Sequence, residues 1–125
     1  MKDKNTFGEF YRSLVKSVSF VGKDNPIRVE VPFRFQDGDL FVIYVEETEE
    51  GTFVLSDRGH TLMRISFESE DIVFPKHITD STLKNISGEL IMKFQKKEDF
   101  ATALFTFCQF LSQVEIINSQ TRRLT

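Results

Sequence analysis

Residues 27–35 alternate apolar and polar side chains, and an Asp-Gly pair follows them; this feature constrains the fold more than any other. The apolar members stand at every second position, as in a half-buried β-strand: Ile27, Val29, Val31, Phe33 and Phe35. Asp37 and Gly38 both tolerate positive φ, as a type I′ turn requires, and a second apolar run follows at 40–45. The pattern predicts a β-hairpin closed by a two-residue turn.

A two-residue turn also predicts the pairing of the two strands, with Phe35 opposite Leu40, Phe33 opposite Val42, and Val31 opposite Tyr44. The second run is apolar on both faces and the first is not. We therefore expect the second strand to be central and the first to lie at a sheet edge, where Pro32, which lacks an N–H, is tolerated.

Helical periodicity marks the two ends of the chain. Apolar residues recur every three or four positions from Phe7 to Val18, and Thr6 with Glu9 fits a capping box, so a helix is predicted up to Gly22. After Asp99, a second stripe predicts a terminal helix: Phe100, Leu104, Phe107, Leu111 and Val114. Phe105 and Ile116 lie off this stripe, as expected of an oligomer or partner surface.

Between these helices the patterns are shorter. Strands are predicted at 52–55 and 90–94, and a short helix is preferred at 61–65. Residues 66–80 are expected to be irregular, and N-caps at 79–81 predict a short helix that ends before Gly88. The fold class is therefore α+β in one domain over residues 1–125, with an antiparallel sheet of about four strands in a hairpin meander and the N-terminal and C-terminal helices packed on it.

Composition and charge limit the cellular compartment and the class of partner that are expected. A single cysteine, Cys108, excludes an internal disulfide, and no leader or membrane span is expected, so the protein is predicted to be cytoplasmic. The net charge is −3, but residues 24–80 carry −8. Such a surface repels phosphate, so nucleic acid is disfavoured as a partner and another protein is expected. The predicted binding surface is acidic: Glu46, Glu47, Glu49, Glu50, Asp37 and Asp39.

Asp57, Arg58 and His60 are the candidates for catalysis, because a carboxylate that orients an imidazole can support general acid–base chemistry. The alternative is structural: Asp57 caps a turn, Arg58 is solvated, and His60 packs beside the sheet. The carboxylates of Asp37, Asp39, Glu46, Glu47 and Asp57 are of the type that binds magnesium or calcium. The Asp-Gly turn accounts for the first two without a metal, so no metal or cofactor is expected.

Three segments together resemble a known family: Asp37-Gly38-Asp39, the run Ile43-Tyr44-Val45-Glu46, and residues 53–62 with Ser56-Asp57-Arg58-Gly59-His60-Thr61-Leu62. The chain resembles the bacterial and phage domain-of-unknown-function family numbered eighteen-twenty-eight, and the match continues through Gly88-Glu89-Leu90 and the final Phe-rich helix. The resemblance implies a fold and a setting in bacteria or their mobile elements. It carries no established activity.

These observations favour a small intracellular protein-binding module that acts stoichiometrically on a partner protein, and they favour a non-enzyme over an enzyme. One alternative is a nucleic-acid-processing enzyme that uses Asp57 and His60. The other is a homodimer similar to secretion chaperones, which rests on the order of elements alone.

Overall fold

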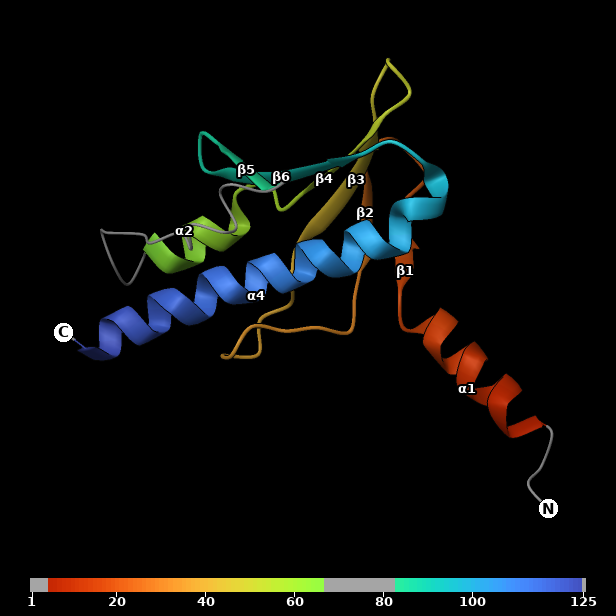
Figure 1. Ribbon diagram of the computed structural model, residues 1–125, viewed down its shortest axis with the longest axis horizontal. Helices are drawn as coiled ribbons and strands as arrows, with labels where there is room; N and C mark the ends of the chain where they lie inside the picture. The colour runs from red at the N-terminus through yellow and green to blue at the C-terminus, as the bar shows by residue number, and fades with distance from the viewer. Residues whose placement is uncertain (1–4, 67–82, 125) are drawn as a thin grey trace.

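The computed structural model describes residues 5–66 and 83–124. One face of a six-stranded antiparallel sheet is crossed by a long C-terminal helix (Figure 1). The strand order is β1-β2-β3-β4-β6-β5. The elements are α1 Asn5–Lys16, β1 Ser19–Val21, β2 Ile27–Glu30, β3 Ile43–Glu47, β4 Phe53–Ser56, α2 His60–Ser66, β5 Leu83–Ile86, β6 Glu89–Phe94, the 3-10 turn η1 Lys97–Asp99, and α4 Phe100–Leu124. The predicted α+β class is confirmed, and the sheet has six strands where about four were expected.

The predicted hairpin forms with a different register. β2 and β3 pair Val29 with Ile43, and residues 31–42 leave the ladder as an excursion that carries one further bridge, between Arg34 and Leu40. At its tip the Gly38 N–H donates to the Phe35 carbonyl oxygen at 2.9 Å. The predicted pairing of the two strands is therefore wrong.

The turn explains the new register. Gly38 has φ of 92°, whereas Asp37 is not among the residues with positive φ, so the tip is a three-residue loop and not a type I′ turn. The Asp37 carboxylate accepts the Asp39 N–H at 3.1 Å, which is the local Asx turn that this residue favours. The excursion contributes to the core, because its residues Val31, Phe35 and Phe41 are buried there.

The N-terminal helix is shorter than predicted. α1 ends at Lys16, where the Ser17 N–H and hydroxyl both donate to the Leu14 carbonyl oxygen, at 3.1 and 2.6 Å. Residues 19–21 then form β1, which pairs with β2 and takes the edge of the sheet. The expectation that the first strand of the hairpin is an edge strand is therefore wrong, because β1 covers it.

In the middle of the chain, the observed elements agree in part with those predicted from the sequence. β4, α2 and β6 confirm the elements predicted at 52–55, 61–65 and 90–94. The segment predicted to be irregular, 66–80, lies almost wholly outside the described residues. The helix predicted before Gly88 is wrong in its described part, because β5 pairs with β6 there. Ser87 and Gly88, with φ of 54° and 90°, close this hairpin as a two-residue turn with both φ values positive.

α4 supplies the core. Its predicted stripe is confirmed: Leu104, Phe107, Leu111 and Val114 are fully buried against the sheet residues Val29, Ile43, Leu55 and Leu90. By length and composition alone the helical stretch 97–118 is apolar enough to cross a membrane. Of that stretch, 28% is buried within the chain, and the stripe on the sheet belongs to this buried part. Phe105 and Ile116 lie off the stripe, as expected, and are 49% and 41% exposed.

Candidate functional site

Asp57, the first of the catalytic candidates, is fully buried between β4 and α2. One oxygen of its carboxylate accepts the N–H groups of Gly59 and Leu90, both at 2.9 Å. The other oxygen accepts the Thr61 N–H at 3.2 Å, in the first turn of α2. The carboxylate thus joins the start of a helix to β6, and its lone pairs are directed at backbone donors.

Arg58 and His60 do not complete a catalytic arrangement with Asp57. Arg58 has φ of 54°, and its guanidinium lies 5.1 Å from the centre of the Tyr44 ring, on the sheet. The His60 ring lies 6.3 Å from the Phe35 ring and is half-buried. The three residues are neighbours in sequence, but their side chains face three different surroundings.

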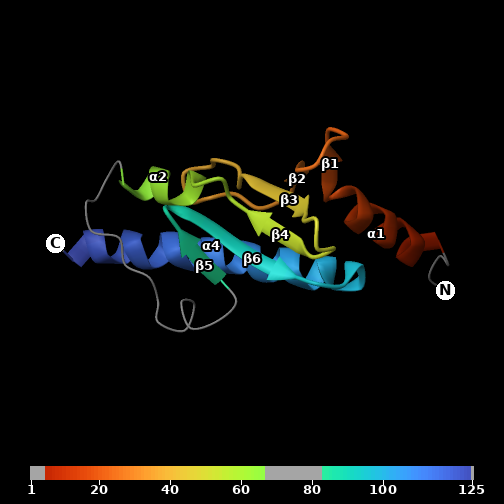
Figure 2. The same ribbon diagram turned by 90° about the horizontal axis from the view of Figure 1, so that it is seen from above.

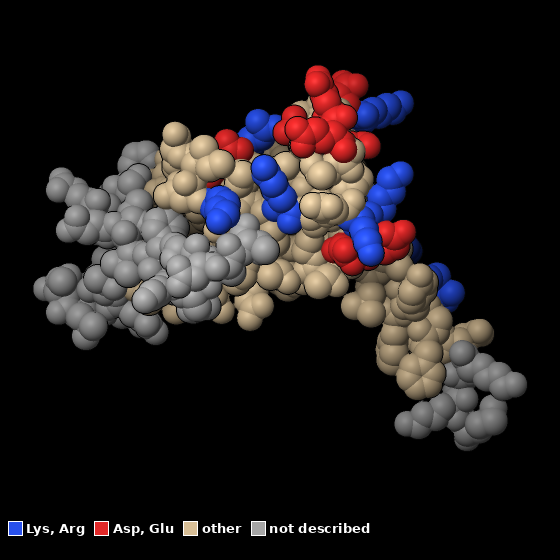
Figure 3. Space-filling model, turned by 45° about the horizontal axis from the view of Figure 1, so that its top comes forward, with Lys and Arg blue, Asp and Glu red and all other residues tan. Residues whose placement is uncertain are grey.

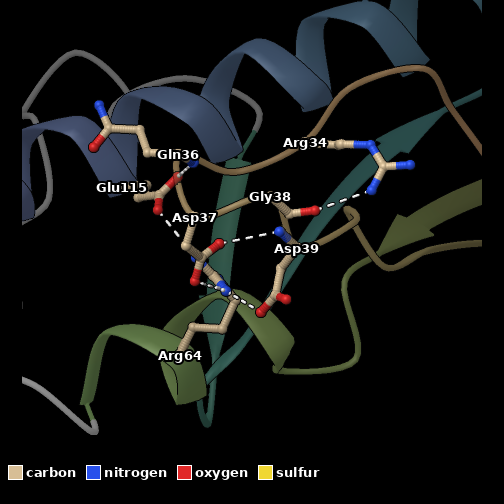
Figure 4. Close-up of polar contacts among 7 residues, drawn as sticks. All are labelled: Arg34, Gln36, Asp37, Gly38, Asp39, Arg64 and Glu115. Atoms are coloured by element: carbon tan, nitrogen blue, oxygen red, sulfur yellow. Dashed lines mark hydrogen bonds and ion pairs between the residues drawn. The ribbon is translucent and has the colours of Figure 1, made fainter.

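A second polar cluster, centred on Arg64, was not predicted from the sequence (Figure 4). Arg64 projects from α2 and makes ion pairs with Asp37 at 3.0 Å, with Asp39, and with Glu115 of α4 at 3.0 Å. Its guanidinium also lies 4.1 Å from the centre of the Phe35 ring. This Arg64 cluster, comprising Asp37, Asp39, Arg64 and Glu115, ties the turn at 36–38 to both helices.

The electrostatics of the Arg64 cluster follow from the one cation and three carboxylates. The hydrogen bond from Arg64 holds the pKa of Asp37 below its usual value. Burial opposes the charge of Arg64, but its hydrogen bonds with Asp37 and Glu115 outweigh this and raise its pKa. Glu115 is 9% exposed and also accepts the Gln36 N–H at 3.4 Å, so its charge is held by two partners.

Asp37 and Asp39 were predicted to share a surface with the glutamates of the β3–β4 turn, and the structure places them apart. The four glutamates, Glu46, Glu47, Glu49 and Glu50, are all exposed. Acidic side chains gather over this turn in Figure 3. The two aspartates lie at the other end of β3, in the excursion seen below α4 in Figure 1, and Arg64 neutralises part of their charge. Of the predicted acidic surface, the part that stays together is the tip of the β3–β4 hairpin, with Glu46 and Glu47 at the end of β3 and Glu49 and Glu50 in the turn.

α1 presents the largest unpaired apolar surface among the described residues. Both views of the ribbon show α1 projecting away from the sheet (Figures 1 and 2). None of its residues is buried. Its apolar stripe is exposed as follows: Phe7 71%, Phe10 58%, Tyr11 69%, Leu14 72% and Val15 57%. Periodicity identified these residues correctly, but it implied that they pack on the sheet of the same chain.

The described residues contain no group of three His, Cys, Asp or Glu side chains placed to hold a metal ion. Cys108 lies on the buried side of α4, and this burial raises its pKa to about 12, so the thiol carries no charge at neutral pH. Neither feature adds a catalytic group to those already named.

Comparison with known proteins gives one result. No curated protein matches the chain, and no solved structure matches it. One family model does match, over residues 31–114, which is more than half of the chain and includes Asp57, Arg64 and the excursion. α1, β1 and β2 precede the matched range. The chain belongs to the family described as Domain of unknown function DUF1828.

Proposed function

We propose that the chain is a small protein-binding module that acts stoichiometrically, by contact with another polypeptide, and that α1 is its docking element. The observation that carries the proposal is the exposure of every large apolar side chain on α1. We further propose a cytoplasmic setting, in bacteria or their mobile elements, which the single buried cysteine supports.

The apolar face of α1 is exposed to water at a cost in free energy, and docking on a partner would remove this cost. An isolated helix of 12 residues is marginal in water, because most helical stability in proteins comes from packing of the apolar face. Each large side chain that moves from water into an interface contributes roughly 1.5–3 kcal/mol. Five such side chains on one helix supply the driving force for docking, and no surface of the described chain uses it.

The β3–β4 turn is a second contact surface of this module. Glu49 and Glu50 in this turn, with Glu46 and Glu47 at the adjoining end of β3, bring like charges together, and such repulsion is relieved when a basic surface docks there. Charge at the rim of an interface acts chiefly on the association rate and on salt dependence. We therefore assign the turn to steering a partner and α1 to holding it.

No observation at Asp57 or His60 favours the alternative of a nucleic-acid-processing enzyme. The Asp57 carboxylate is fully buried and accepts three backbone N–H groups, so it serves the turn that starts α2. We therefore assign both residues structural roles.

The proposal is tested with the immobilised full chain and a lysate of the organism that encodes it. The wild type is compared with a variant that carries Phe10→Asp and Leu14→Asp, and with Ile86→Asp, a control of similar exposure, 57%, on the opposite sheet edge. Bound proteins are quantified by mass spectrometry at low and high salt. We expect near-stoichiometric recovery of a partner with the wild type and the control, and its loss with the α1 variant.

A further variant tests the acidic turn: Glu46, Glu47, Glu49 and Glu50 are changed together to Gln. We expect a slower association and a weaker salt dependence, with dissociation unchanged. Partner recovery that is unaffected by the α1 variant, or a full effect on the partner at sub-stoichiometric amounts of the chain, contradicts the proposal.

A further inference from the structure

We infer that the partner of α1 is a second copy of this chain: the edge strands β1 of two copies pair antiparallel about a two-fold axis, and α1 of each copy lies in a groove of the other. The inference rests on the proposed function, because it names the partner of the same docking helix. Four observations support it, namely an open groove, the direction of β1, the charges that meet, and the area buried.

The groove lies on the core face of the sheet, where β2 begins, β3 ends and β4 begins. It has a volume of about 530 Å³, and its floor contains the half-buried Ile27, Val45 and Phe53. Each of these residues stands two positions from a fully buried core residue on the same strand, Val29, Ile43 or Leu55, and so faces the same side. This end of the core face is thus incompletely covered within the chain. An apolar helix face is the natural complement of such a floor.

The direction of β1 decides which helix reaches the groove. β1 pairs Ser19 with Glu30 and Val21 with Arg28, so α1 of the same chain leaves the sheet at the Glu30 end of β2. The groove lies at the opposite end, beside Ile27. A two-fold axis beside β1 reverses the strand direction, and it therefore brings α1 of the second copy to the Ile27 end.

β1 is suited to such pairing. It is an edge strand of three exposed residues, Ser-Phe-Val, and it carries none of the charges or prolines with which edge strands commonly block a second chain. Its central residue, Phe20, is 55% exposed, and its ring lies 5.6 Å from that of Phe100 at the start of α4. Pairing centred on Phe20 adds a second Phe20 to this aromatic contact.

The two surfaces carry opposite charges. The rim of the groove carries Glu47 and Glu49, and α1 carries Arg12 and Lys16 on its polar side. These arginine, lysine and glutamate side chains form no ion pair within the described structure, so they are available to a second copy.

The area is that of a stable dimer. An aromatic side chain buries about 150–250 Å² when it is fully covered, so the five half- to three-quarter-exposed residues of α1 offer roughly 500 Å² per helix. Complete coverage of two helices, with an equal area on the surfaces that receive them, sets an upper limit of about 2,000 Å² in total, within the standard range for specific interfaces. The groove receives part of this helix face, and the paired β1 strands and the rim of the groove contribute the remaining contact.

Sedimentation equilibrium of the full chain tests the inference. We expect a mass twice the 14.5 kDa of the chain at micromolar concentration. The Phe10→Asp and Leu14→Asp variant should raise the dimer dissociation constant at least about 100-fold. Ile86→Asp, on the β5 edge, should leave it unchanged. A mass of one chain at about 100 μM overturns the inference.

Charge exchange identifies a second copy as the partner. Arg12 and Lys16 changed together to Glu, or Glu47 and Glu49 changed together to Lys, should each weaken the dimer about tenfold, and the combined variant should recover wild-type affinity within about threefold, because it restores the attraction with its sign reversed. Failure of the combined variant to recover contradicts the placement of α1 in the groove of a second copy.

A cysteine placed on the two-fold axis tests the pairing of β1 directly. Phe20→Cys faces its own copy across the axis and should cross-link on mild oxidation, since directly opposed residues have Cβ atoms about 4.5–5.5 Å apart. Val21→Cys faces Ser19 instead and should not. The native thiol does not interfere because Cys108 is buried. Equal cross-linking of the two variants, or none, overturns the β1 pairing.

The failures of the two proposals are distinguishable. A chain that is monomeric, yet loses a partner of different sequence when α1 is changed, refutes the dimer and leaves the docking role of α1 in place. A dimer that survives the Phe10→Asp and Leu14→Asp variant, together with partner recovery from the lysate that the same variant leaves unaffected, refutes both.

Discussion

Replacing Asp57 with Asn is the sharpest test of its structural role, because Asn keeps the size of the side chain and removes one acceptor. The carboxylate accepts three backbone N–H groups, from Gly59, Thr61 and Leu90, at 2.9 to 3.2 Å. An amide has one acceptor oxygen, so at least one of these buried donors meets an NH₂ group instead.

The magnitude follows from these contacts. A hydrogen bond to a charged group contributes roughly 1.5–3 kcal/mol, and a buried donor left without an acceptor costs roughly 1–3 kcal/mol. Asp57 is 0% exposed, so water cannot replace the lost acceptor. We expect Asp57→Asn to lower the free energy of unfolding by about 3 kcal/mol, and Asp57→Ala to lower it further.

The assay is urea denaturation followed by far-UV circular dichroism, at one protein concentration because association shifts apparent stability. Glu50→Gln is the matched control, since it makes the same chemical change at an exposed position and should stay within about 0.5 kcal/mol of wild type. A loss below about 1 kcal/mol for Asp57→Asn, with the slope of the transition unchanged, would refute the role assigned to this carboxylate.

Three further predictions concern the turn, the Arg64 cluster and metals. Gly38→Val should lower stability by more than about 1 kcal/mol in the same assay, because a β-branched residue at φ of 92° is strained although nothing lies within 4 Å of its Cβ; an unchanged midpoint contradicts this turn geometry. The folded-state pKa of Asp37 is depressed, so its ion pair with Arg64 stabilises the fold at neutral pH and this contribution is lost as pH falls through that depressed pKa. Arg64→Met should therefore lower stability at pH 7 and reduce its acid dependence, and an unaltered pH profile of the melting temperature argues against the cluster. Magnesium, manganese and calcium should leave the melting temperature unchanged, and a shift that Asp39→Asn abolishes would place a metal at the turn.

Elements with strong local periodicity were predictable from the sequence. The stripe of α4 was identified residue by residue, because an apolar period of 3.6 residues sustained over four turns fits a helix and does not fit a strand. The strands at 53–56 and 89–94 and the helix α2 were likewise predicted from turn residues and β-branched or apolar runs. The acidic and apolar residues of the proposed binding surfaces were also named from the sequence.

Register and sheet order were not predictable in the same way. An Asp-Gly pair fits both a two-residue and a three-residue loop, and the choice depends on hydrogen bonds made by the whole excursion 31–42. Residues 19–21 continue the helical spacing of α1, yet they form a strand because β2 offers them a ladder. Local pattern alone does not decide between a helix and a strand at such positions.

The amino-acid sequence by itself determined the class of fold, the core stripe of α4 and the amphipathic character of α1, because each depends on residues that are neighbours within a few turns or positions. Tertiary structure alone decided the Arg64 cluster, since its members come from segments up to 78 residues apart, as with Asp37 and Glu115. It also decided that Asp57 is a buried acceptor for β6 and that α1 stands off the sheet of its own chain. Such contacts join elements that are far apart in the sequence, and this separation does not indicate their distance in space. They are therefore determined only once the sheet is assembled.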